Sequence, residues 1–264
     1  MELSLQELKK ELAGEIIGHS IHYFQEIGST NDEACRLGRE GAPEGTVVVV
    51  NSQSAGKGRL QRSWFSPPGC NIYTSVILRP EFNPADAPQI TIMAGLAAAQ
   101  MIETYCPRKT RIKWPNDILL HGKKVCGILA QMQAGADKID FVVLGIGINV
   151  NIAADEFPPE IKNIATSIAA QTGVFQSRQD LLINLYKNLS KWYKTLTSNG
   201  FEIIRQEWLK MASLTGCEIQ VKFRDEIIKG KALTIDERGA LVMSDSKGKT
   251  VKILAGDASI MKEN

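Results

Sequence analysis

Residues 53–66 have the composition of a loop that can hold a polyphosphate. They read QSAGKGRLQRSWFS, with the glycines and cations Gly56, Lys57, Gly58, Arg59 and Arg62. Glycine lets the backbone approach a ligand closely, and guanidinium groups pair with phosphate oxygens. The segment lacks the glycine–lysine–hydroxyl ending of a Walker A motif, and Gln61 stands where a dinucleotide fingerprint requires its last glycine. A solvated basic loop has the same composition, but the adjacent Trp64 and Phe65 favour a lid that stacks on a base or closes a pocket.

Two further segments place polar groups beside the ends of predicted strands. KWPND occupies residues 113–117, and Pro115 forces an extended backbone at the preceding residue, so that Asn116 and Asp117 follow as a polar pair. KVCGILAQ occupies residues 124–131, and Lys124 opens this otherwise apolar run. A cation at the rim of a buried sheet can neutralise charge on a transferring phosphoryl or acyl group. A plain Asn-Asp turn and an edge-guarding lysine would look the same in isolation.

The remaining two motifs are GSTND at residues 28–32 and GIGINVN at residues 145–151. The first places small donors at a predicted helix N-terminus, which suits an anion or a small polar head group, although a strand-to-helix turn with a hydroxyl cap is the better explanation of this motif taken alone. The second ends a buried strand in glycine-rich backbone beside Asn149. A flat ligand can lie against such a strand, or the strand can simply be tightly packed.

These motifs need a scaffold, and hydrophobic periodicity predicts one. Strands are expected at residues 22–25, 46–51, 71–78, 111–114, 118–120, 125–133 and 138–148, and helices at residues 3–13, 29–41, 86–105, 161–172, 178–197 and 201–212. Short β runs then follow at residues 218–221, 227–235, 240–244 and 250–254, split by turn residues. We therefore predict a catalytic domain over residues 1–214, with a helical extension at 1–20, and a small β-barrel over residues 215–264.

Composition excludes several classes of protein. The 264 residues carry 31 Lys plus Arg against 29 Asp plus Glu, and a net charge of +2 gives no general attraction to DNA or anionic lipid. No apolar stretch reaches the ~18 residues of a membrane helix, and the N-terminus lacks the pattern of a signal peptide. Five cysteines without C-x-x-C spacing and three scattered histidines argue against a disulfide framework and a zinc site. The chain is expected to be cytoplasmic, without DNA or membrane partners.

The order of the motifs resembles that of the biotin protein ligase family. GSTN, a GxGR loop with Arg and Trp, KWPND, K-x-x-GIL and GIGIN follow one another over about residues 20–260, and KWPND followed by KVCGIL is the most specific part. The resemblance implies an α+β fold, with a mixed sheet like that of class II aminoacyl-tRNA synthetases and an SH3-like C-terminal barrel that ends in GDAS at residues 256–259. It also implies a stand-alone ligase, because too few residues precede the first motif for a winged helix-turn-helix.

Family members join biotin to a specific lysine of a biotin carboxyl carrier domain, such as that of acetyl-CoA carboxylase. The resemblance implies ATP and Mg²⁺ as cofactors, biotin as substrate, biotinyl-5′-AMP as intermediate and a homodimer as assembly. Two anions must come together in the first step, so cations must offset their repulsion. The intermediate is sensitive to water, so a loop must close over it.

The resemblance also implies roles for individual residues. Those expected to bind biotin are Ser29, Thr30, Asn31, Gln53, Lys57, Gly58, Arg59, Lys124, Gly127 and Asn149. Those expected to bind ATP are Arg59, Arg62, Trp64, Lys113, Asn116, Asp117 and Lys124. Lys124, Arg59 and Asp117 are the expected catalytic residues. Asp117 is the candidate contact for Mg²⁺, for which no cage of protein ligands is expected.

Four positions depart from the family pattern: Lys57 and Gln61 in the loop, Gln131 after the GIL motif, and Met261 near the C-terminus. Gln61 replaces a glycine and Met261 replaces an arginine, which motivates the alternative of a non-catalytic biotin sensor. The presence of Lys124 and Asp117 counts against that alternative. A lipoyl or octanoyl ligase of the related fold is a further alternative, disfavoured by the order of the motifs.

Overall fold

The computed structural model describes residues 3–135, 138–223 and 226–261, and its centre is a seven-stranded mixed sheet. The strands are β1 (Ile21–Ile27), β2 (Val47–Gln53), β3 (Ile72–Leu78), β4 (Thr110–Lys113), β5 (Asp117–Leu120), β6 (Lys123–Ala134) and β7 (Ile139–Ile148). Their order is β1-β2-β3-β7-β6-β5-β4; β1 and β2 run parallel, and all other neighbours are antiparallel. The predicted α+β fold is confirmed.

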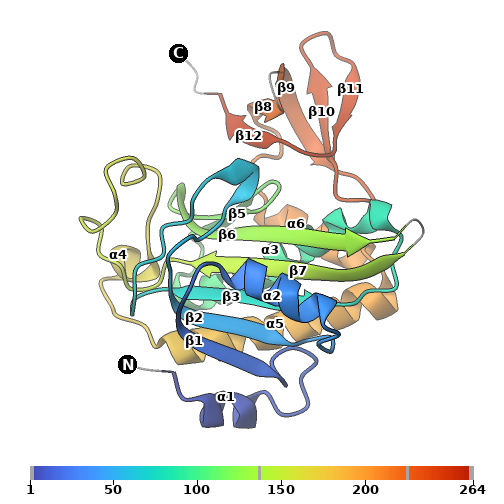
Figure 1. The fold of residues 1–264 in the computed structure, drawn as a ribbon. Coiled ribbons are helices and arrows are strands. Elements are labelled where there is room, and N and C mark those ends of the chain that lie inside the picture. Colours follow the sequence, from blue (N-terminus) through green and yellow to red (C-terminus); the bar gives the residue numbers. More distant parts are fainter. Residues whose placement is uncertain (1–2, 136–137, 224–225, 262–264) are drawn as a thin grey trace.

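Helices cover both faces of this sheet (Figure 1). They are α1 (Leu5–Glu11), α2 (Thr30–Arg39), α3 (Pro88–Tyr105), α4 (Ile168–Thr172), α5 (Arg178–Asn199) and α6 (Glu202–Met211), with 3₁₀ turns η1 (Arg59–Gln61) and η2 (Pro84–Asp86). The layer of α3, α5 and α6 covers one face, and α2 packs on the other. Alternate valines of β2 point to opposite faces of the sheet. Val47 and Val49 join the main core, while Val48 packs under α2.

One predicted helix is much shorter in the structure. The run at residues 161–172 forms a helix only from Ile168, because the Ser167 hydroxyl caps that end by accepting from Ala170 N. The residues before it run beside β6 instead: Lys124 N donates to Ile164 O at 2.8 Å, and Thr166 N donates to Lys124 O at 2.9 Å. A loop that flanks Lys124 thus replaces the expected helical turns.

The C-terminal residues form a second sheet of five antiparallel strands. These are β8 (Glu218–Phe223), β9 (Glu226–Ile235), β10 (Leu241–Asp245), β11 (Thr250–Ile253) and β12 (Asp257–Ile260), in the order β11-β10-β9-β8-β12. The last strand was not expected from the sequence, and it places Asp257 opposite Lys222 of β8. Closure of this sheet into a barrel and a domain boundary after residue 214 stay predictions.

Hydrogen bonds to one turn of the C-terminal sheet fix it to the larger domain. The buried Trp114 indole donates from Nε1 to Gly239 O at 3.0 Å, and Arg205 donates to Ile235 O at 3.2 Å. Gln89 donates to Glu237 O at 3.0 Å. The residue before Pro115 in KWPND is therefore a structural contact between the two sheets. Among the described residues, every helix is too short or too polar to cross a lipid bilayer.

Replacing Trp114 with phenylalanine is expected to lower the free energy of unfolding by about 1–3 kcal/mol, because a buried carbonyl loses its donor. Urea unfolding measures this loss, and hydrogen exchange locates it: amides of residues 236–241 should exchange faster. Trp192→Phe is the matched control, because Trp192 Nε1 donates to Gln100 Oε1 at 2.8 Å within the helical layer. Unchanged exchange at 236–241 in Trp114→Phe would contradict the assigned docking contact.

Candidate active site

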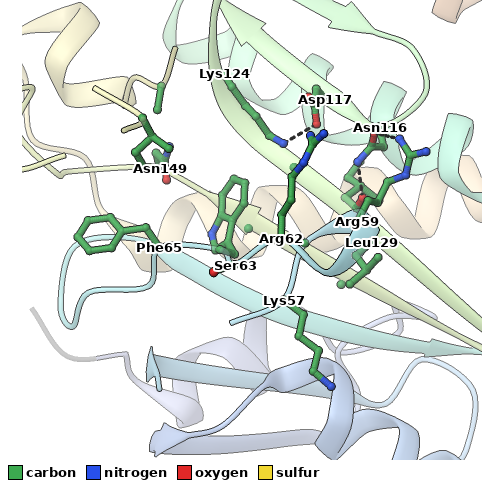
Figure 2. Close-up of a pocket in the computed structure, with 18 of the residues that line it drawn as sticks. Lys57, Arg59, Arg62, Ser63, Phe65, Asn116, Asp117, Lys124, Leu129 and Asn149 are labelled. Atoms are coloured by element: carbon green, nitrogen blue, oxygen red, sulfur yellow. Dashed lines mark hydrogen bonds and ion pairs between the residues drawn. The ribbon is translucent and has the colours of Figure 1, made fainter. Parts of the chain in front are cut away.

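One cavity of about 470 Å³ collects every residue that the sequence analysis assigned to a site. Its walls come from the start of α2, the loop at 53–66, the facing ends of β4 and β5, and strands β6 and β7 (Figure 2). The predicted residues in its lining are Ser29, Thr30, Asn31, Gln53, Lys57, Gly58, Arg59, Arg62, Trp64, Lys113, Asn116, Asp117, Lys124, Gly127 and Asn149. Their proximity supports a shared site, and their individual roles stay predictions.

One end of the cavity is a network of neutral polar side chains at the start of α2. Gln53 Oε1 accepts from Thr30 N at 2.9 Å and from Thr30 Oγ1 at 3.2 Å. Asn31 Nδ2 donates to Gln131 Oε1 at 2.7 Å. Gln131, which departs from the family pattern, thus supplies an amide oxygen as the acceptor. Within the described part of the chain, the Ser29 hydroxyl makes no capping hydrogen bond. GSTND therefore forms the expected turn from strand to helix with Ser29 at the N-cap position, but without the expected hydroxyl hydrogen bond.

Ser75 belongs to this network, and sequence reasoning missed it. Its hydroxyl lies 2.8 Å from Thr30 Oγ1 and 2.7 Å from Asn31 Oδ1, and the residue is fully buried in β3. The available signal was a pair of hydroxyl residues inside the apolar run IYTSVIL. Only the pairing of β3 with β7, and the packing of α2 above them, reveals which face Ser75 occupies.

The floor beside this network is the Trp64 indole on two glycines. A Cβ added to Gly127 would lie 2.7 Å from Trp64 Cζ3, and one added to Gly147 would lie 2.5 Å from Trp64 Cε2. The glycine-rich strand thus does admit a flat group, and in this structure that group is a side chain of the loop. The Lys124 ammonium lies 5.2 Å from the indole ring centre, within range of a cation–π contact.

The charged end of the cavity centres on Lys124. Its Nζ lies 2.6 Å from Asp117 Oδ1, and both side chains are mostly buried (Figure 2). The two residues come from the paired strands β5 and β6, in which Asp117 lies opposite Gly127 and Lys124 opposite Leu119. Asn149 supports the same region, because its Nδ2 donates to Thr166 O at 3.0 Å in the segment beside Lys124. A cation held this way can meet an anion in the cavity.

Arg59 connects the loop to both sheets. It donates to Asn116 Oδ1 at 2.8 Å and to Gly256 O at 3.1 Å, and it lies 3.5 Å from Asp257 Oδ1. Burial lowers the pKa of the Arg59 guanidinium, while the charge of Asp257 and then of Asp117 opposes this shift. The group stays protonated, because an arginine begins from a pKa above about 12. Asp257, which lies in the GDAS segment at residues 256–259, also lines the cavity, and the sequence analysis gave it no role there.

The charge of Lys57 does not point into the cavity. Its Nζ lies 2.6 Å from Asp32 Oδ1 on α2, and Figure 2 shows the side chain directed away from Arg59 and Lys124. Both partners of this pair are about half exposed. The geometry therefore does not support the expected contact between the Lys57 ammonium and a ligand, although the residue lines the cavity.

The loop also contains backbone strain at the position that departs from the family pattern. Leu60 has φ 53° and Gln61 has φ 58°, both in the left-handed region that favours glycine. Such a conformation costs a residue other than glycine about 1 kcal/mol or more. Gln61 thus adopts the backbone that a glycine would take, and surrounding contacts must offset the cost.

Known proteins resemble this chain in sequence and in fold. Residues 23–149 match the biotin/lipoate A/B protein ligase family, and residues 216–261 match the biotin protein ligase C-terminal domain. The bifunctional ligase/repressor BirA of Bacillus subtilis is 38% identical over 98% of this chain and 79% of its own length. The biotin–[acetyl-CoA-carboxylase] ligase of Paracoccus denitrificans is 33% identical, over 84% of this chain and 93% of its own. The biotin protein ligase of Aquifex aeolicus, in complex with biotin and ATP, superposes with a TM-score of 0.79 at 30% identity, covering 92% of this chain and 99% of that one.

Replacing Gly147 with alanine is expected to push the Trp64 indole off the strand and release the loop. Overpacking costs about 1–3 kcal/mol, so trypsin should cut after Arg59 and Arg62 about tenfold faster. Gly135→Ala is the control, because no described atom lies within 4 Å of its added Cβ. Equal cleavage rates in the two variants would show that the indole does not anchor the loop.

Proposed function

The chain belongs to the biotin protein ligase family, and we propose that it joins biotin to a specific lysine of a biotin carboxyl carrier domain at the expense of ATP. One observation carries this proposal: a neutral hydrogen-bonding end and the Lys124–Asp117 pair share a single cavity, roofed by a basic loop. Such a cavity can hold a neutral polar ring at one end and bring a carboxylate to a cation at the other.

The neutral end suits the cyclic urea of biotin. A urea presents one carbonyl acceptor and two N–H donors without charge, and the side chains of Thr30, Asn31 and Gln53, held from behind by Ser75, offer a hydroxyl and amides of both polarities. Neutral partners match a neutral head group without leaving a buried charge unpaired. We assign Ser29, Gly127 and Asn149 to the surrounding wall of the same pocket.

The charged end suits the first chemical step. A carboxylate oxygen of biotin bonds to the α-phosphorus of ATP, the bond from that phosphorus to the bridging oxygen breaks, and pyrophosphate leaves. Both reactants are anions, so cations fixed in the cavity lower the barrier. We assign Lys124 to the carboxylate and α-phosphate, Arg59 to the same reacting groups, and Arg62 and Lys113 to the remaining phosphates.

In the second step the amine of the carrier lysine attacks the acyl carbon, the amine loses a proton and AMP leaves. Asp117 lies beside Lys124 and is the carboxylate that we assign to orienting the incoming amine. Asn116 and Trp64 are assigned to the nucleotide. A roof formed by the loop excludes water from the mixed anhydride.

The donor set fits a magnesium ion that arrives with the nucleotide. Mg²⁺ is usually held by one or two carboxylates together with phosphates, and Asp117 supplies one carboxylate in the cavity. Among the described residues, no group of three or more His, Cys, Asp or Glu side chains forms a metal cage. When bound with ATP, the ion would neutralise phosphate charge, and Asp117 is the residue that we assign to it.

The acceptor that we propose is the carrier domain of acetyl-CoA carboxylase. Biotin is favoured over lipoate or octanoate because residues 216–261 match a C-terminal domain named for biotin protein ligases alone. A homodimer, a cytoplasmic location and the absence of DNA and membrane partners stay predictions.

The test is to mix the protein with biotin, Mg-ATP and the purified carrier domain and to weigh the carrier intact. A single biotin adduct that requires ATP is expected. Lys124→Ala should slow adduct formation by about 100-fold or more, because a cation is removed from the developing charge. Lys123→Ala, one residue away and outside the cavity lining, should label the carrier normally. No adduct, with biotin still bound by calorimetry, would instead indicate a sensor.

Arg59→Gly is expected to open the roof and let biotinyl-5′-AMP escape, so that lysines of bystander proteins become labelled. Its three hydrogen-bonding partners hold the loop over the cavity, and glycine replaces none of them. Arg108→Gly makes the same chemical change at an exposed position with φ 62°, which glycine tolerates. Labelling of added serum albumin, measured by mass, should rise several-fold over wild type in the first variant only. Labelling confined to the carrier lysine would contradict the roof assignment.

A further inference from the structure

Asp257 is an acidic side chain placed against the two arginines of the basic loop. Its Oδ2 lies 2.7 Å from Arg62 NH2, and its Oδ1 lies 3.5 Å from Arg59 NH1. The neighbouring Gly256 carbonyl accepts from Arg59 at 3.1 Å. A carboxylate at this point is unexpected in a cavity that must receive a triphosphate, because like charges repel.

The position of Asp257 is set by the C-terminal sheet and not by the loop. Asp257 begins β12, which pairs with β8 over residues Asp257–Ile260. The same sheet is fixed to the larger domain through the Trp114 contact with Gly239. The loop, in contrast, has a strained backbone at Leu60 and Gln61. The carboxylate is therefore the fixed partner, and the loop is the segment that it holds.

The two arginines depend on Asp257 to different degrees. Arg59 is 22% exposed and keeps Asn116 and Gly256 as further partners, whereas the Arg62 side chain is 67% exposed and has its ion pair with Asp257. Phosphate oxygens are strong partners for a guanidinium group. A triphosphate can therefore take Arg62 from Asp257 while Arg59 continues to hold the loop.

We propose that Asp257 is a positioning residue that occupies Arg62 in place of a phosphate, orders the loop before nucleotide binds, and is displaced from Arg62 by the triphosphate. This inference rests on the proposed function, because it takes ATP as the ligand of the basic loop. Two opposite effects follow from one carboxylate: it stabilises the closed loop without nucleotide, and it competes with the nucleotide for the same cation. A residue that only helped to build the ATP site would not compete.

The experiment compares Asp257→Asn with wild type in two measurements that need no biotin transfer. Without ligand, amides of residues 58–64 should exchange with solvent about two- to fivefold faster, the range that a partly exposed ion pair supports. Inorganic tripolyphosphate, followed by calorimetry, should bind about two- to fivefold more tightly, because its competitor is gone. Asp257→Glu should restore wild-type values, and Glu218→Gln, an exposed carboxylate of the same sheet, should change neither.

Weaker or unchanged tripolyphosphate binding in Asp257→Asn would overturn the proposal, as would unchanged exchange. Salt provides a second test in folded wild-type protein: raising the ionic strength screens the pair, so loop exchange should rise in wild type and much less in Asp257→Asn. An equal rise in both would also overturn it. If tripolyphosphate binds as expected but the carrier gains no biotin, the proposed function fails while the role of Asp257 stands.

Discussion

The packing of the Trp64 indole on the bare backbone of Gly127 and Gly147 is the constraint on which the rest of the site depends. Either strand residue with a Cβ would meet the ring at less than 3 Å. This contact fixes the C-terminal end of the basic loop on the central strands, and the loop then spans the cavity from α2 to the C-terminal sheet. Along this path Arg59 reaches Asn116 and Arg62 reaches Asp257.

Three of the cations around the cavity have carboxylate partners before any ligand enters. Lys57 pairs with Asp32, Lys124 with Asp117, and Arg62 with Asp257, all within 2.7 Å. The Lys57–Asp32 and Arg62–Asp257 pairs are partly exposed, so each contributes only about 0–1 kcal/mol to stability. Weak pairs suit a site that must exchange protein carboxylates for phosphates. They keep the cations oriented and let the substrate anions replace their partners at little cost.

The sequence predicted those parts of the site that depend on residues close together in the chain. The basic loop, KWPND and Lys124 were found because their residue types and spacing already indicate chemistry, and the family resemblance supplied their order. The place of Ser75 behind Thr30 and Asn31, and that of Asp257 in the cavity lining, were not found, because pairing with distant strands sets the position of each. The direction of Lys57 was missed for a related reason: its partner Asp32 becomes available only after α2 packs on the sheet. The predicted helix at residues 161–172 was too long at its N-terminal end. Its apolar periodicity includes residues before Ser167, and these hydrogen-bond with Lys124 instead.

The departures at Gln61 and Gln131 can be understood in the same physical terms. Gln131 keeps an acceptor for Asn31, so the neutral network needs no carboxylate at that position. Gln61 holds a left-handed backbone that glycine would adopt without strain. This backbone conformation destabilises the closed loop by about 1 kcal/mol. The packing of Trp64 on the central sheet and the ion pairs of Asp257 in the C-terminal sheet offset that cost. Closure of the loop is therefore a shared property of the two sheets, and the C-terminal sheet contributes to the active site through a residue that no loop motif contains.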